Sequence, residues 1–217
     1  APKDQWASFW FAWASVLNEP EFGVRGFHAA DCEKGEGLFR GWERPRIEAL
    51  QQRLIGLITS SEYGIKGYAV SFPIGAHAAQ RDVLKTFAFL DGGSVNGPLD
   101  DPWFFGFLSL IVAVVDDPRP FIPAGEQVGF FFDRHHLQAR GEAIYSAMES
   151  AGVGGGRLKK GGVAFEDREH AVPLQAADLF AYEVFRYRLD TGLDHRPERW
   201  HHKSLRSITA LSSWIDE

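Results

Sequence analysis

The most regular hydrophobic patterns in this chain have the spacing of helices. Between residues 2 and 18, aromatic and aliphatic side chains recur every three or four positions, which is typical of an amphipathic helix. The same spacing predicts further helices over residues 45–60, 102–115, 137–151 and 174–189. Runs rich in β-branched and aromatic residues predict strands at 64–72, 127–132 and 163–165. Alternation of helices and strands indicates an α/β fold, which we expect to form a single domain over residues 1–217.

The segments between these elements have weaker patterns. Residues 19–41 are rich in glycine and charge, and we expect them to be irregular. Residues 83–89 fit either a strand or a short helix, and residues 92–101 contain the residue types of turns. The glycine-rich segment 152–162 lacks the Gly-Lys-Ser/Thr ending of a phosphate loop, so we interpret it as a flexible connector.

Composition limits the classes of protein that fit. With 217 residues and 45% hydrophobic content, the chain can bury a substantial core. A net charge of −6 argues against coating nucleic acid by charge alone, although a local basic groove stays open around Arg40, Arg44, Arg46 and Arg53. The single cysteine, Cys32, excludes an internal disulfide and a multi-cysteine zinc site; we interpret it as an inert thiol in a reducing, cytoplasmic compartment.

We expect no membrane contact. The most apolar run, residues 103–115, has the length of a buried core helix, and we find no secretion signal. The chain begins at Ala1 without an initiating methionine, and we expect that a segment upstream has been lost.

A carboxylate interrupts the apolar face of the helix predicted at 174–189. At about 100° per residue, Asp178 projects among the apolar residues of one arc, which we expect to face the core, with Gln175 and Tyr182 flanking it. The arc comprises Leu174, Ala177, Ala181, Val184, Phe185 and Leu189. A buried carboxylate needs a cation, a hydrogen bond or a metal ion. The alternative is that Asp178 lies at the rim of the arc and pairs with Arg186 or Arg188.

A second carboxylate follows the strand predicted at 127–132. Asp133 ends that strand, and the ends of buried strands in α/β sheets often carry functional side chains. The alternative is that Asp133 caps the next helix or shapes a turn. Of His135 and His136 at most one can join Asp133, because neighbours in an extended chain point in opposite directions, and we favour a solvated pair. Asp133 and Asp178 together predict a site for Mg²⁺ or Mn²⁺, ions that prefer oxygen ligands and can activate water against a phosphodiester.

Three segments together resemble a known family. They are LQAADLFAY at 174–182, the strand ending at Asp133, and FHAAD at 27–31. They are similar to motifs of the domain of unknown function 3800 family, whose genes often lie near mobile elements. The resemblance implies a ribonuclease-H-like mixed sheet flanked by helices, with Asp133 and Asp178 as metal ligands. It also implies that Gln175 orients Asp178 or a phosphate and that His28 and Asp31 support the site. From the residues alone, His28 packing on its neighbour and Asp31 capping a turn is equally open.

One departure from the family affects the expected function. Family members open with a central strand that carries an acidic motif, and this chain starts beyond that point. We therefore expect either a truncated chain or a site completed by other residues, with a partner chain able to supply the strand. The predicted function is a divalent-metal-dependent phosphodiester hydrolase acting on nucleic acid, associated with mobile elements or defence. One alternative is a non-catalytic module of the same fold that binds nucleic acid or protein. In another, the carboxylates are purely structural.

Overall fold

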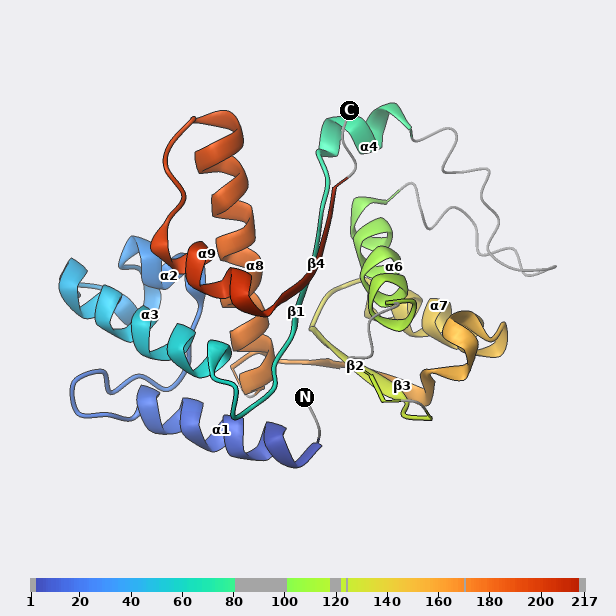
Figure 1. Ribbon diagram of the computed structural model, residues 1–217, viewed down its shortest axis with the longest axis horizontal. Helices are drawn as coiled ribbons and strands as arrows, with labels where there is room; N and C mark the ends of the chain where they lie inside the picture. The colour runs from blue at the N-terminus through green and yellow to red at the C-terminus, as the bar shows by residue number, and fades with distance from the viewer. Residues whose placement is uncertain (1–2, 81–100, 118–121, 124, 170, 215–217) are drawn as a thin grey trace. The chain divides into compact units, whose positions relative to one another are not determined.

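The computed structural model describes residues 3–80, 101–117, 122–123, 125–169 and 171–214, and within them the chain is mixed α/β and predominantly helical (Figure 1). This confirms the predicted fold class at that level. The α-helices are α1 (Lys3–Leu17), α2 (Ala29–Lys34), α3 (Arg44–Thr59), α4 (Ile74–Ala79), α6 (Pro102–Val115), α7 (Gln138–Ser150), α8 (Val172–Tyr187) and α9 (Trp200–Leu205). The strands are β1 (Gly67–Ser71), β2 (Val128–Asp133), β3 (Leu158–Glu166) and β4 (Thr209–Trp214).

Short 3₁₀ and π turns complete the elements. They are η1 (Gly37–Phe39), η3 (Val153–Gly156), the π turn η4 (Arg188–Leu193) and η5 (Arg206–Ile208). Among the described helices, none combines the length and the hydrophobicity that crossing a membrane requires.

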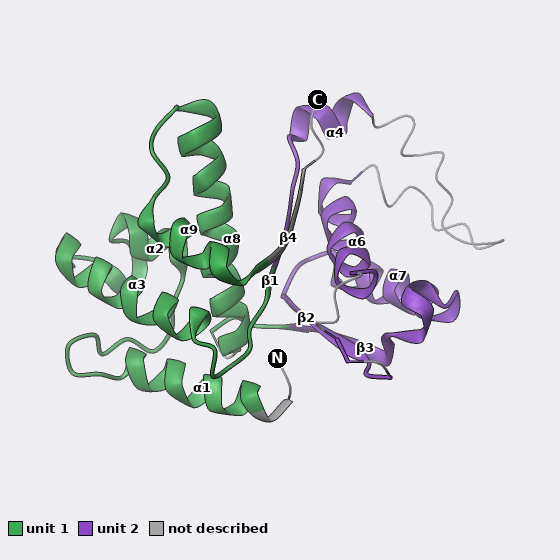
Figure 2. Ribbon diagram, in the orientation of Figure 1, with its two compact units in different colours: residues 1–67, 166–210 green, residues 68–165, 211–217 purple. Residues whose placement is uncertain are grey.

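The chain forms two compact units (Figure 2). Unit 1 comprises residues 1–67 and 166–210, and unit 2 comprises residues 68–165 and 211–217. Within the described residues β1 pairs with β4 and β2 pairs with β3, each pair forming a two-stranded sheet. The expectation of one domain stays a prediction.

Unit 2 is built around the apolar helix that the sequence pattern predicted at 102–115. The Asp101 carboxylate accepts a hydrogen bond from the backbone N–H of Trp103 at 2.8 Å, and Pro102 occupies the first turn, so the start of α6 is fixed locally. The buried side chains of α6 share one core with side chains of β2, α7 and β3. That core comprises Phe104, Phe107, Leu108, Ile111, Val115, Phe130, Ile144, Tyr145, Met148 and Leu158.

Unit 1 is a helical assembly. Helix α3 packs against α1 and α9, and α8 packs against α1, α2 and α9 (Figure 1). Its fully buried side chains include Phe9, Trp13, Leu50, Leu54 and Leu179. Each such side chain contributes about 1.5–3 kcal/mol when it leaves water. The helices predicted at 2–18, 45–60 and 174–189 are confirmed as α1, α3 and α8.

Several segments have a structure that differs from the predicted one. Segment 19–41, which we expected to be irregular, contains α2 and η1. The pattern did not predict α2 because a six-residue helix is too short to show a hydrophobic period. Segment 152–162 contains η3 and the first half of β3, not a flexible connector. Its Lys159 and Lys160 are exposed, so this half of the strand lacks an apolar pattern. Helix α9 and strand β4 had no predicted counterpart. Segments 83–89 and 92–100 lie outside the described residues.

The predicted buried face of α8 is wrong in part, although its Leu174 and Val184 are buried. Ala177, Ala181 and Phe185 are exposed, Phe185 by 55%. The buried residues are Val172, Leu174, Gln175, Ala176, Leu179, Phe180, Glu183 and Val184. Two polar side chains, Gln175 and Glu183, lie on this buried face. The predicted arc was drawn through apolar residues alone, so it is rotated towards the exposed side of α8.

Candidate functional site

The first cluster of candidate residues surrounds Asp178 on α8. Its Oδ2 accepts a hydrogen bond from the backbone N–H of Ala29 at 2.7 Å, and its Oδ1 lies 3.9 Å from Nε2 of His28. A carboxylate at the first residue of α2 is stabilised by the free N–H groups of that helix end. Asp178 thus has a hydrogen-bond partner, but its side chain is 26% exposed and lies at the rim of the buried face, not within it. Arg186, one of the two arginines considered for it, pairs instead with Asp190 at 2.8 Å.

His28 stands between two carboxylates. Its Nδ1 lies 3.0 Å from Oδ2 of Asp31, while its Nε2 side faces Asp178. The side chains of His28, Asp31 and Asp178 are 28%, 40% and 26% exposed, so the cluster is open to solvent on one side. Gly37 borders Asp31 with a φ of +53°, and a Cβ on it would lie 3.0 Å from Oδ2 of Asp31. Glycine therefore leaves room for this carboxylate.

Gln175 fixes the backbone beside the cluster. It is buried and accepts hydrogen bonds from Nε1 of Trp13 at 3.0 Å and from the backbone N–H of Phe27 at 3.1 Å. Its Nε2 donates to the backbone oxygen of Arg168 at 2.9 Å. Gln175 therefore holds the chain that leads into His28. The structure brings together four residues that the sequence singled out, at 28, 31, 175 and 178.

Asp133 belongs to unit 2, whereas the cluster around Asp178 belongs to unit 1. Asp133 ends β2, is exposed, and its Oδ1 accepts a hydrogen bond from the backbone N–H of Arg134 at 3.0 Å. The expected solvated pair is wrong for His135, which is half-buried with its ring stacked on Trp103 at 4.8 Å, and right for the exposed His136. Since Asp133 and Asp178 belong to different units, a metal site shared by them stays a prediction.

The fit to a divalent cation is incomplete. Across the described ranges, no three His, Cys, Asp or Glu side chains gather as a metal site. In the cluster of unit 1, Asp31 and Asp178 lie at opposite nitrogens of His28, so they do not converge on one ion. Mg²⁺, however, is often held by one or two carboxylates together with waters and substrate phosphates. Asp178, with Oδ1 not used by the Ala29 hydrogen bond, fits the role of a single ligand.

A second polar cluster, not expected from the sequence, lies on the same helices. Glu33 of α2 is half-buried and has three partners. Nη2 of Arg199 lies 3.0 Å, Nε2 of Gln51 3.1 Å and Nη1 of Arg44 3.2 Å from its carboxylate oxygens. Burial acts to raise the pKa of Glu33, but the Gln51 hydrogen bond and the two arginines outweigh it and lower this pKa.

Two further members of this cluster are more deeply buried. Nε2 of His201 lies 2.9 Å from Oε1 of Gln51, and burial together with the charge of Arg199 lowers the pKa of His201 to about 4. Glu183 is fully buried, and its Oε1 lies 3.6 Å from Nη2 of Arg199. Burial raises the pKa of Glu183 to about 7 against the effect of Arg199. The sequence contains a signal for Glu183. Residues 175, 179 and 183 are four positions apart, so they lie on one face of α8.

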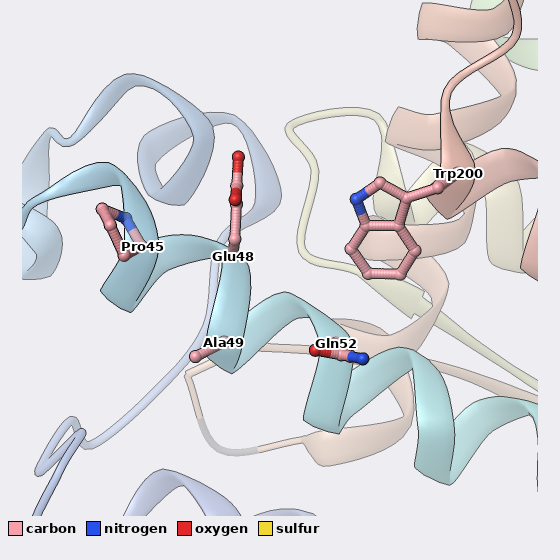
Figure 3. Close-up of a pocket in the computed structure, with 5 residues that line it drawn as sticks. All are labelled: Pro45, Glu48, Ala49, Gln52 and Trp200. Carbon is pink, nitrogen blue, oxygen red and sulfur yellow. The ribbon is translucent and has the colours of Figure 1, made fainter.

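A surface pocket of about 450 Å³ lies between α3 and α9 (Figure 3). It is lined by Pro45, Glu48, Ala49, Gln52 and Trp200. The indole of Trp200 is 41% exposed and stacks on His201 with ring centroids 3.9 Å apart. Glu48 pairs with Arg44 at 2.8 Å.

The arginines of α3 do not favour the basic groove considered for this region. Arg44 pairs with Glu33 and Glu48, and Arg53 pairs with Glu19. The guanidinium of Arg46 lies 3.8 Å from the ring centroid of Trp42 and donates to the backbone oxygen of Phe22 at 3.1 Å.

Comparisons of the chain with protein-family models, curated proteins and solved structures found no match. Its function is therefore argued from the site.

Proposed function

We propose that the protein hydrolyses phosphodiester bonds in nucleic acid with the help of Mg²⁺ or Mn²⁺, and that His28, Asp31 and Asp178 form part of its active site. The observation that carries the proposal is the partly exposed imidazole of His28 between two carboxylates. A ribonuclease-H-like fold, membership of the domain of unknown function 3800 family and a role near mobile elements belong to the same proposal.

The geometry suits His28 as a general base. The carboxylate of Asp31 lies 3.0 Å from Nδ1 without the geometry of a hydrogen bond, and its negative charge favours the tautomer with the hydrogen on Nδ1, which leaves the lone pair on Nε2. This lone pair can accept a proton from a water as its oxygen bonds to phosphorus and the bond to the leaving oxygen breaks. The leaving oxygen takes up a proton from His28 or from solvent. Asp178 beside Nε2 stabilises the imidazolium formed in between.

A bound cation would neutralise phosphate charge and lower the pKa of a coordinated water. Asp178 is the ligand that unit 1 offers, and Asp133 is the ligand predicted from unit 2. Gln175 accepts a hydrogen bond from the backbone N–H of Phe27 and so fixes the chain directly before His28. It thereby supports the position of His28 beside Asp178.

The test is a cleavage assay on single- and double-stranded DNA and RNA with Mg²⁺, Mn²⁺ or a chelator. We expect cleavage that needs the metal and that falls by about 10²–10⁴ in His28→Gln and in Asp178→Asn. Matched controls are His202→Gln and Asp194→Asn, whose side chains pair with Glu198 and Arg196. Full activity in Asp178→Asn would refute the assignment.

The same assay separates the rival function. A non-catalytic module binds its target in the presence of chelator, cleaves nothing, and tolerates Asp133→Asn and Asp178→Asn alike. The paired arginines of α3 offer little free positive charge for such binding.

A further inference from the structure

Helix α2 is anchored through Glu33. A helix of six residues does not hold its conformation in isolation, so α2 depends on its contacts. The carboxylate oxygens of Glu33 lie 3.0 Å from Nη2 of Arg199, 3.1 Å from Nε2 of Gln51 and 3.2 Å from Nη1 of Arg44. These partners lie just before α9 and on α3. Asp31 lies on α2, two residues before Glu33. The contacts of Glu33 therefore also set the position of Asp31 beside His28.

Arg199 faces a second carboxylate. Its Nη2 lies 3.6 Å from Oε1 of Glu183, which is fully buried on α8. Neither oxygen of Glu183 makes a hydrogen bond within the described residues. An ionised carboxylate in this setting depends on its counterion. The guanidinium of Arg199 therefore faces two carboxylates, those of Glu33 and Glu183. The charge on Glu183 decides whether Arg199 pairs with Glu33 alone or with both.

Glu183 is the member of this cluster that changes charge near neutral pH. Burial raises its pKa to about 7. His201, with a pKa lowered to about 4, stays neutral over the same range, and Arg186 is already paired with Asp190. The charged and titratable groups that act on Glu183 are Arg199, Glu33, Arg186, Asp190 and Tyr182.

We infer that Glu183 is a buried proton switch: when its carboxyl takes up a proton, Arg199 binds Glu33 alone and α2 is held firmly, and when the proton leaves, α2 loosens. Glu33 and Arg199 are then positioning residues for the cluster at His28. The consequence for catalysis rests on the proposed function, whereas the coupling between Glu183 and α2 does not.

The single cysteine of the chain is a probe of this coupling. Cys32 lies on α2 next to Glu33, is fully buried, and has a pKa raised by burial to about 12, so a thiol reagent reaches it only when α2 opens. We compare labelling rates of the unsubstituted chain and of Glu183→Gln, which imitates the protonated carboxyl. Hydrogen exchange at the amide of Leu54, in the core of α3, reports global unfolding alongside.

At about pH 8 the unsubstituted chain should label roughly three- to tenfold faster than Glu183→Gln, and at about pH 6 the two rates should agree, since Glu183 has a pKa of about 7. Glu33→Gln, which removes the anchor, should label faster than both at either pH. Glu19→Gln, a carboxylate paired with Arg53 away from the cluster, should behave as the unsubstituted chain.

Equal labelling of the two chains at about pH 8, near which Glu183 is ionised, would overturn the inference. So would labelling of Cys32 no faster than the unfolding that exchange at Leu54 reports, because α2 would then open only together with the rest of unit 1. A failure of the cleavage assay leaves these rates unaffected, so the two proposals are tested separately.

Discussion

Replacing Gln175 by alanine should destabilise unit 1 strongly, although Gln175 is a polar residue. The substitution removes an acceptor shared by the indole N–H of Trp13 and the backbone N–H of Phe27, and a donor to the backbone oxygen of Arg168. All three groups then need new partners. Since Gln175 is 2% exposed, bulk water does not reach them directly.

The magnitude follows from counting the abandoned groups. A buried donor or acceptor left without a partner costs about 1–3 kcal/mol. A water entering the vacated space can satisfy part of them, so we take the low end for each of the three. The free energy of unfolding should therefore fall by about 3 kcal/mol. Trp13→Phe, which removes one of the three donors or acceptors, should cost about 1 kcal/mol.

The assay is equilibrium unfolding in urea, followed by tryptophan fluorescence, together with hydrogen exchange at the amide of Phe27. Gln52→Ala is the matched control, since Gln52 is exposed on α3 and a surface change of this kind stays within about 0.5 kcal/mol. A loss no larger than that of Gln52→Ala, or an unchanged Phe27 amide, would show that Gln175 does not hold this backbone.

Three further outcomes are expected. Because the pKa of Glu183 rises from 4.5 to about 7 on folding, the folded state retains a proton that the unfolded state releases, and stability falls as pH rises through this window. Glu183→Gln should therefore gain up to about 3 kcal/mol relative to the unsubstituted chain between about pH 5 and pH 8 in denaturant titrations, and equal stabilities at both pH values would contradict this. Mn²⁺ at a hundredfold excess over its dissociation constant should stabilise the unsubstituted chain by about 2.7 kcal/mol in thermal melts, but not Asp178→Asn; an equal response of both excludes Asp178 as a ligand. Gly37→Ala should cost about 1 kcal/mol, because its φ is +53° and the added Cβ would lie 3.0 Å from Oδ2 of Asp31; an unchanged melting temperature would show that this turn relaxes freely.

Local pattern was informative about the long elements. The helices at 2–18, 45–60 and 102–115 were predicted almost to their ends, because each must present a continuous apolar face and the sequence shows that face directly. Helix α2 was missed because six residues hold less than two helical periods. The motif at 27–31 and the helix at 174–182 indicated a shared site, and their side chains do meet in unit 1.

The sequence by itself determined where the long helices form, because periodicity is a property of neighbours along the chain. Only the tertiary structure decided which polar residues are buried on these helices and how they are satisfied. Gln175 meets Trp13, 162 positions away, and Gln51 meets His201, 150 positions away. Such pairings leave no periodic trace, since the partner of a buried polar group depends on which distant helix covers it. The pairing of Glu183 with Arg199 is of this kind: the face that residues 175, 179 and 183 share on α8 points to Glu183, but only the packing of α8 against α9 brings Arg199 to it.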